Sequence, residues 1–190
     1  MSAHAGLLPH EQRMSIDDLV DRGDCTRTMI AEVKRFAAEP FGMLTLWGSW
    51  GNGKTAALAA LVNHFNALCA GTAIYVRFAD LLEAIREGFD ERADVRAEAR
   101  HRLLLAIPFL AIDEVDKAHM TEWAGQFRAR FFDDRYRQAR SGLAHTALAL
   151  NFDPSGLAEH LYDRLRWGED LQGGFRIVRN EDPSARPRGL

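Results

Sequence analysis

One string constrains the fold of this chain more than any other part of its sequence: Gly48-Ser49-Trp50-Gly51-Asn52-Gly53-Lys54-Thr55. It has the form G-x-x-x-x-G-K-[ST] and lies between an apolar run at 42–47 and an Ala- and Leu-rich run at 55–70. In that setting a strand leads into a glycine loop, and the loop into a helix whose first N–H groups hold phosphate oxygens. A chance glycine turn with an exposed lysine is the alternative. The flanking strand and helix favour a nucleoside triphosphate site.

Each part of the string has an expected task. The three glycines permit backbone angles that side chains would obstruct, and Lys54 reaches the β- and γ-phosphates. Thr55 offers its hydroxyl to Mg²⁺. Trp50 is an unusual residue inside such a loop and is expected to pack over its outer face. All eight residues are expected to contact the nucleotide, so ATP and Mg²⁺ are the predicted cofactors.

Hydrolysis needs carboxylates as well as a phosphate loop. Four apolar residues at 109–112 precede Asp113 and Glu114, as expected where a buried strand ends. Asp113 is placed to hold the metal with its water shell, and Glu114 to act as the general base that activates water. A solvated acidic loop is the alternative, because Asp116 follows closely. The apolar run favours the catalytic interpretation.

Two further polar residues are candidates for catalysis. Asn151 follows the apolar run at 144–150 and would lie beside Asp113 if the two strands are neighbours, where its amide could hold the attacking water. The alternative is a turn-forming asparagine before a helix cap. Arg164 could reach the nucleotide of an adjacent subunit and stabilise transition-state charge. Its alternative is a surface ion pair with Asp163 or Glu159.

The periodicity predicts an α/β fold in which a mostly parallel five-stranded sheet is sandwiched by helices. Strands are expected at 42–47, 73–78, 108–112, 144–150 and 175–178, and helices at 26–38, 55–70, 80–89, 91–105, 121–140 and 154–168. Asp80 is expected to cap the third helix, and Asp153 the last one, with Pro154 in its first turn. Residues 1–24 are expected to form an arm or linker, 25–180 the ATPase domain and 181–190 a tail.

Composition excludes several classes of protein. The net charge is −3, so binding to nucleic acid would need a local patch rather than bulk charge. No apolar run approaches the roughly 18 residues that a membrane span requires, and the N-terminus lacks the pattern of a secretory signal. The two cysteines, Cys25 and Cys69, make no metal or disulfide pattern. A cytoplasmic protein without membrane contact is expected.

A run of arginines is the candidate patch for DNA. The arginines are interleaved with aromatic residues, a composition that combines phosphate attraction with base stacking. The arginines are Arg128, Arg130, Arg135, Arg137 and Arg140, and the aromatic residues are Phe127, Phe131, Phe132 and Tyr136. The aromatic residues also fall at helical spacing, which favours core packing for the phenylalanines. A solvated face is favoured for much of the arginine run, and Arg135 and Tyr136 are the first members to test for contact with single-stranded DNA.

With these motifs in place, the chain resembles the AAA+ helicase loaders of the DnaC and DnaI type and the related transposition helper ATPases of the IstB type. The resemblance spans roughly 25–187. It rests on the Gly48–Thr55 loop as Walker A, Phe109–Glu114 as Walker B, and Asn151 as sensor 1. The segment at 163–166 is similar to the arginine-finger helix of that family, with Arg164 as the finger and Arg166 in reserve.

The resemblance implies an ATPase with an AAA+ core that assembles as a homo-oligomer on single-stranded DNA and delivers a replicative helicase. Help to a transposase and a nucleotide-gated binding module with little turnover are the alternatives. A small-molecule kinase would need an arginine-rich lid, which the sequence does not show. Neither a helicase-binding domain before the core nor a helical lid after it is expected.

Overall fold

The structure is a computed structural model that describes residues 6–40, 42–86, 93–117, 119, 121–166, 175–182 and 184, with the helical backbone alone at 93–98 and 100. Its centre is a five-stranded sheet in the order β2-β3-β4-β1-β5, and every pairing is parallel. The strands are β1 (Met43–Trp47), β2 (Ala73–Arg77), β3 (Phe109–Asp113), β4 (His145–Leu150) and β5 (Arg176–Arg179). The predicted α/β sheet is confirmed.

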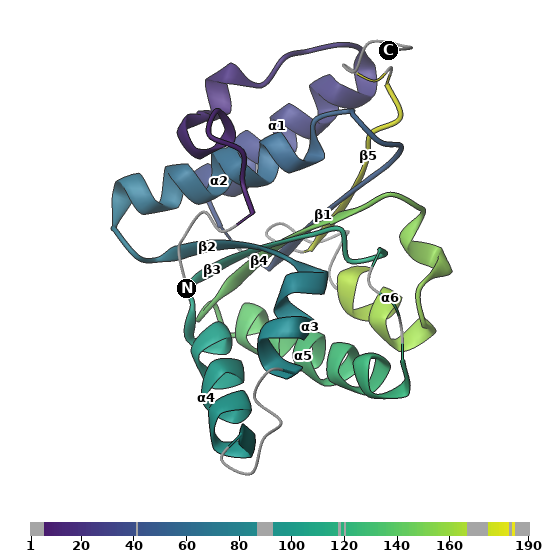
Figure 1. Cartoon of the computed structure of the whole chain (residues 1–190). Coiled ribbons are helices and arrows are strands. Elements are labelled where there is room, and N and C mark those ends of the chain that lie inside the picture. The colour runs from purple at the N-terminus through teal and green to yellow at the C-terminus, as the bar shows by residue number, and fades with distance from the viewer. Residues whose placement is uncertain are drawn as a thin grey trace.

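Helices cover both faces of the sheet (Figure 1). α1 (Asp24–Ala38) and α2 (Lys54–Leu68) lie on one face, and α3 (Phe78–Arg86), α4 (Ala93–Ala106), α5 (Glu122–Arg140) and α6 (Glu159–Arg166) lie on the other. Successive side chains of a strand point to opposite faces of the sheet, so each strand contributes to a hydrophobic core on both faces. In β1, Leu44 packs toward α1 and α2, whereas Met43 packs toward α5 and α6. Among the described residues, none after β5 forms a helix, in agreement with the absence of a lid domain.

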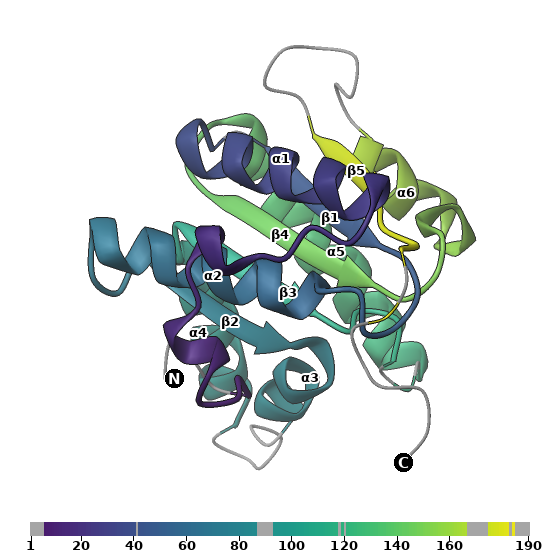
Figure 2. The same ribbon diagram turned by 90° about the horizontal axis from the view of Figure 1, so that it is seen from above.

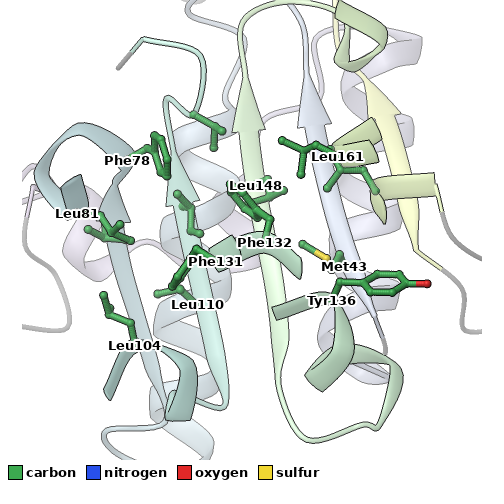
Figure 3. Close-up of a cluster of buried hydrophobic side chains, with 14 of the residues drawn as sticks. Met43, Phe78, Leu81, Leu104, Leu110, Phe131, Phe132, Tyr136, Leu148 and Leu161 are labelled. Carbon is green, nitrogen blue, oxygen red and sulfur yellow. The ribbon is translucent and has the colours of Figure 1, made fainter. Parts of the chain in front are cut away.

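α5 supplies aromatic side chains to the hydrophobic core on its face of the sheet. Phe131 and Phe132 are buried against Leu110 and Leu148 of the sheet, as Figure 3 shows. Thr121 caps this helix by accepting a hydrogen bond from the backbone N–H of Ala124 (3.2 Å). The expectation that the phenylalanines pack in the core is confirmed for Phe131 and Phe132, and Phe127 is partly buried against the same core.

The structure argues against Arg135 and Tyr136 as the first members of the arginine run to test for contact with DNA. Arg135 has no exposed surface and Tyr136 is buried beside it. The Arg135 guanidinium donates to the Thr146 hydroxyl (2.9 Å) and to the backbone carbonyls of residues 104, 105, 107 and 145. Burial lowers the pKa of this guanidinium to about 10. Arg135 therefore ties α5 to the chain around α4 and to the start of β4.

We expect Arg135→Ala to lower the free energy of unfolding by about 3 kcal/mol or more, because each buried acceptor left unpaired costs roughly 1–3 kcal/mol. Urea unfolding followed by far-UV circular dichroism measures this change. Arg137→Ala is the matched control on the same helix. Its side chain is 73% exposed and pairs with Asp133 at 2.7 Å, so a change within about 0.5 kcal/mol is expected. Equal losses in the two variants would contradict the assignment.

Helix boundaries differ from the sequence prediction at two places. After β4 the expected single helix is broken: a 3₁₀ turn at Pro154–Gly156, capped by Asp153, is followed by extended backbone at Leu157 before α6 begins at Glu159. The predicted end at Gly168 lies outside the described residues. Asp80 does not cap α3, since that helix begins at Phe78 and the Asp80 carboxylate pairs with Arg77 (2.8 Å). Phe89, also assigned to that helix, lies outside the described residues.

Residues 6–23 run across the outer side of α2 before α1 begins (Figure 2). Two 3₁₀ turns, at Glu11–Arg13 and Ile16–Asp18, contact α2. Asn63 of α2 donates its side-chain amide to the carbonyls of Glu11 (3.0 Å) and Met14 (2.8 Å). The segment thus packs against the helix that starts at the glycine loop.

Within the part of the chain that the structure describes, no helix has the length and apolar character needed to cross a membrane. Cys25 is half-buried and Cys69 is exposed, and both are free thiols.

Candidate functional site

The glycine loop lies at the carboxyl edge of the sheet, between β1 and α2, where parallel α/β proteins bind their ligands. A cavity of about 760 Å³ opens there. Its walls come from the loop, the ends of β2 and β3, the residue after β4 and the N-terminal segment; they include Leu8, His10, Met14, Arg22, Trp50, Lys54, Thr55, Tyr75, Asp113, Glu114, Lys117 and Asn151. The structure therefore brings the loop, Asp113, Glu114 and Asn151 to one cavity, whereas Arg164 is not among its walls.

Lys54 is buried and folded back onto its own loop. Its ammonium donates to the carbonyls of Gly48 (2.7 Å) and Ser49 (2.8 Å) and to the Asn52 side chain (3.1 Å). Burial lowers the pKa of this ammonium from 10.5 to about 8, an effect that the charges of Asp113 and Asp116 partly oppose. An incoming phosphate would compete with neutral loop carbonyls for a cation whose charge is costly to bury.

The lowered pKa of Lys54 predicts how phosphate binding depends on pH. Only the protonated form attracts phosphate, and a bound polyanion stabilises it, so the affinity is constant well below pH 8 and falls above it. Between about pH 8 and pH 9.5 we expect the dissociation constant for a non-hydrolysable ATP analogue to rise roughly tenfold per pH unit. Calorimetric titration measures this slope. The Lys54→Met variant should bind the analogue weakly at every pH, and its dissociation constant should not rise in this way. A wild-type dissociation constant that does not change with pH would contradict the prediction.

The loop is also fastened to the chain after β5, through residues that sequence reasoning missed. Asn180 and Asn52 are both buried, and each donates its side-chain amide to the other's backbone carbonyl. Gly48, at φ 140°, lies so close to Asn180 that an added methyl group would collide with its carbonyl. The only sequence signal for Asn180 is its place directly after the last strand.

Thr55 and Asp113 meet at the mouth of the loop. The Thr55 hydroxyl donates to Oδ2 of Asp113 at 2.6 Å, and the carboxylate is almost fully buried. Hydroxyl and carboxylate oxygens suit Mg²⁺, which usually takes one or two protein oxygens and completes its shell with phosphates and water. No group of three His, Cys, Asp or Glu among the described residues could hold a metal by itself. The pair thus fits a magnesium ion that arrives with a nucleotide.

Glu114 stands next to that pair in a strained backbone conformation. Its φ of 54° is the one positive value among the described non-glycine residues, and such outliers gather at functional sites. The Glu114 carboxylate forms an ion pair with Lys117, which also lines the cavity. The side chain is 35% exposed, so water reaches it. The Glu114 carboxylate can accept a proton once its ion pair with Lys117 opens.

Asn151 extends beyond β4 into the same region, since β4 neighbours β3 in the sheet. Its side-chain amide donates to both oxygens of Asp116, at 3.2 and 3.1 Å, and its backbone N–H donates to the same carboxylate. Asp116, which the sequence suggested only as part of an acidic loop, therefore positions Asn151. The amide would have to turn from Asp116 to reach a bound phosphate.

Two residues at the rim of the loop complete the site. Trp50 is 65% exposed at the tip of the loop, as expected of a side chain on its outer face. Arg22 of the N-terminal segment donates to the Gly51 carbonyl at 3.3 Å. This contact brings another cation to the cavity, which Lys54, Arg77 and Lys117 also line, and sequence reasoning did not identify it.

Solved structures of replication proteins share this fold. The chain superposes on DnaI with a TM-score of 0.68 at 21% identity, covering 92% of this chain and 94% of that one. It superposes on the DnaC helicase loader at 0.71 and 15% identity, covering 90% and 99%. The replication initiator DnaA bound to AMPPCP and single-stranded DNA matches at 0.71 and 20% identity, covering 92% and 50%.

At these identities the likeness establishes the fold alone, which this chain shares with these replication proteins. The chain spans about half of the length of the DnaA chain and of a DNA replication initiation factor that it also matches. No protein-family model matches the sequence, and no curated protein matches it.

Proposed function

We propose that this chain is an AAA+ ATPase that binds MgATP, hydrolyses it and uses it to control assembly on single-stranded DNA. The observation that carries the proposal is the 2.6 Å contact between the Thr55 hydroxyl and the Asp113 carboxylate, with Glu114 next in the chain. It joins the phosphate loop after β1 to an acidic pair at the end of β3, although β4 lies between these two strands. That combination suits hydrolysis of a nucleotide better than simple binding of an anion.

The residues of the loop would hold the triphosphate. Backbone N–H groups of the loop and the first turn of α2 would donate to the phosphates. Lys54 would exchange its contacts with the carbonyls of Gly48 and Ser49 for contacts with phosphate oxygens. Thr55 and Asp113 would hold Mg²⁺, which neutralises charge that develops on the phosphate oxygens. Asn52 and Asn180 keep the loop in place during this exchange.

Water activation falls to Glu114. Its carboxylate leaves Lys117, accepts a proton from water and orients that water toward the γ-phosphate. Asn151, released from Asp116, would hold the same phosphate from the side of β4. The water oxygen bonds to the γ-phosphorus as the bond from that phosphorus to the bridging oxygen breaks, giving ADP and phosphate.

Delivery of a replicative helicase is the cellular task that we propose. It is supported by the match over nearly the whole of the DnaI and DnaC helicase loader chains, whereas only half of the DnaA chain is covered. A second candidate is a nucleotide-gated binding module with little turnover. The ion pair that holds Glu114 on Lys117 favours it, because a base held in this way activates no water.

Steady-state ATP hydrolysis across protein concentration, with and without single-stranded DNA, tests the proposal. An assembling ATPase should show specific activity that rises with concentration and responds to DNA. Tight nucleotide binding with negligible turnover under every condition would support the binding module instead. Failure to bind ATP in Mg²⁺ would overturn both.

A further inference from the structure

We infer that Tyr75 is a positioning residue of the magnesium site, which acts by fixing the Asp113 carboxylate. The inference deepens the proposed function and rests on it. Tyr75 lies in β2, opposite Ala111 in the register with β3, so its ring lies on the same face of the sheet as Asp113, two residues further along. Its hydroxyl donates to Oδ2 of Asp113 at 2.8 Å. The tyrosine is 2% exposed.

The hydrogen bonds at Asp113 show what this contact does. Oδ2 accepts from Thr55 and Tyr75, and Oδ1 accepts from the backbone N–H of Glu114 (2.8 Å). A carboxylate offers about four acceptor positions, so roughly one, on Oδ1, is left for a metal ion or its water. Three donors from three directions fix the rotation of the carboxylate. Without the tyrosine hydroxyl, Oδ2 would accept from the Thr55 hydroxyl alone.

Tyr75 is suited to be a permanent donor. Burial, followed by the negative charge of Asp113, raises the pKa of its phenol. The N-terminal segment lies against the ring: a methyl group added at Gly6 would be 3.6 Å from the Cε1 atom of Tyr75. A buried donor on a strand, with the N-terminal segment against its ring, holds its acceptor in one orientation.

Tyr75→Phe removes the hydroxyl and keeps the ring. The probe is a fluorescent, non-hydrolysable ATP analogue, whose dissociation constant is measured in EDTA and in Mg²⁺. We expect the variant to bind the analogue in EDTA as the wild type does, within about twofold. The gain in affinity on adding Mg²⁺ should shrink roughly tenfold, because hydrogen bonds to charged groups are among the stronger ones in proteins.

Tyr136→Phe is the matched control, since Tyr136 is also buried but packs against Phe175 on the other face of the sheet. It should keep the full magnesium gain, and both variants should have melting temperatures near that of the wild type. A full magnesium gain in Tyr75→Phe would overturn the inference and leave the proposed function standing. Equal loss of binding in EDTA and in Mg²⁺ would also overturn it, because the role would then be structural. A wild type that binds the analogue in neither condition would overturn the proposed function as well.

Discussion

Glu114→Gln is expected to slow ATP hydrolysis about a thousandfold and to leave nucleotide binding unchanged, because a general base contributes roughly 10²- to 10⁴-fold. Glutamine keeps the length of the side chain but cannot accept a proton at neutral pH. The strained φ of 54° stays in place, since it belongs to the backbone between β3 and Lys117. Steady-state phosphate release measures the loss, and titration of a fluorescent ATP analogue checks that binding remains.

Glu122→Gln is the control for this measurement. Glu122 is an exposed acid in the first turn of α5 and lies outside the cavity. It should hydrolyse ATP at the wild-type rate. Activity in Glu114→Gln within about threefold of the wild type would remove Glu114 as the base. The nucleotide-gated binding module would gain support if the wild type itself were as slow as the variant.

The sequence was informative where chemistry fixes the spacing of residues. All five strands appear where the apolar runs predict them, and Thr55 meets Asp113 as the two motifs require. This meeting needed no knowledge of the strand order, because all strands of a parallel sheet place their carboxyl ends at the same edge. β4 in fact lies between β1 and β3. The roles assigned to Glu114 and Asn151 stay predictions.

Contacts that depend on register or on burial were beyond the sequence pattern. In the sequence, Tyr75 is one residue of a predicted strand. Only the pairing of β2 with β3 shows that its ring lies on the same face of the sheet as Asp113. Arg135 looks like one more cation in a basic run, because composition does not show that its guanidinium has five acceptors within the fold. Asn180 lies 128 residues from its partner Asn52, so no local pattern joins them.

Arg164 is the residue on which the oligomeric part of the proposal depends. In the structure its guanidinium pairs with Asp133 of α5 at 3.1 Å and lies over the Tyr136 ring, 4.6 Å from its centroid. The ion pair is thus made with Asp133 rather than with the Asp163 or Glu159 suggested by the sequence. The side chain is 43% exposed, and Asp133 also binds Arg137 at 2.7 Å. Arg164 can therefore leave toward a neighbouring subunit while Asp133 stays paired.

Arg164→Ala is expected to lower the activity of the assembled ATPase about a thousandfold, because an arginine acting across a subunit boundary contributes roughly 10³- to 10⁵-fold. Nucleotide binding by the single subunit should not change. Arg137→Ala removes the other partner of the same carboxylate and should retain wild-type activity. Arg166→Ala tests the reserve candidate, whose guanidinium lies over the Tyr162 ring.

Mixing two inactive variants separates action across a boundary from action within one subunit. Glu114→Gln keeps Arg164 but lacks the base, and Arg164→Ala keeps the base but lacks the arginine. If the arginine serves a neighbour's site, a mixture contains boundaries at which an intact Glu114 faces an intact Arg164, and hydrolysis returns in proportion to their number. If both residues act within one subunit, the mixture stays as inactive as its components. That result, together with activity independent of concentration, would remove the arginine finger and most of the case for an assembling loader.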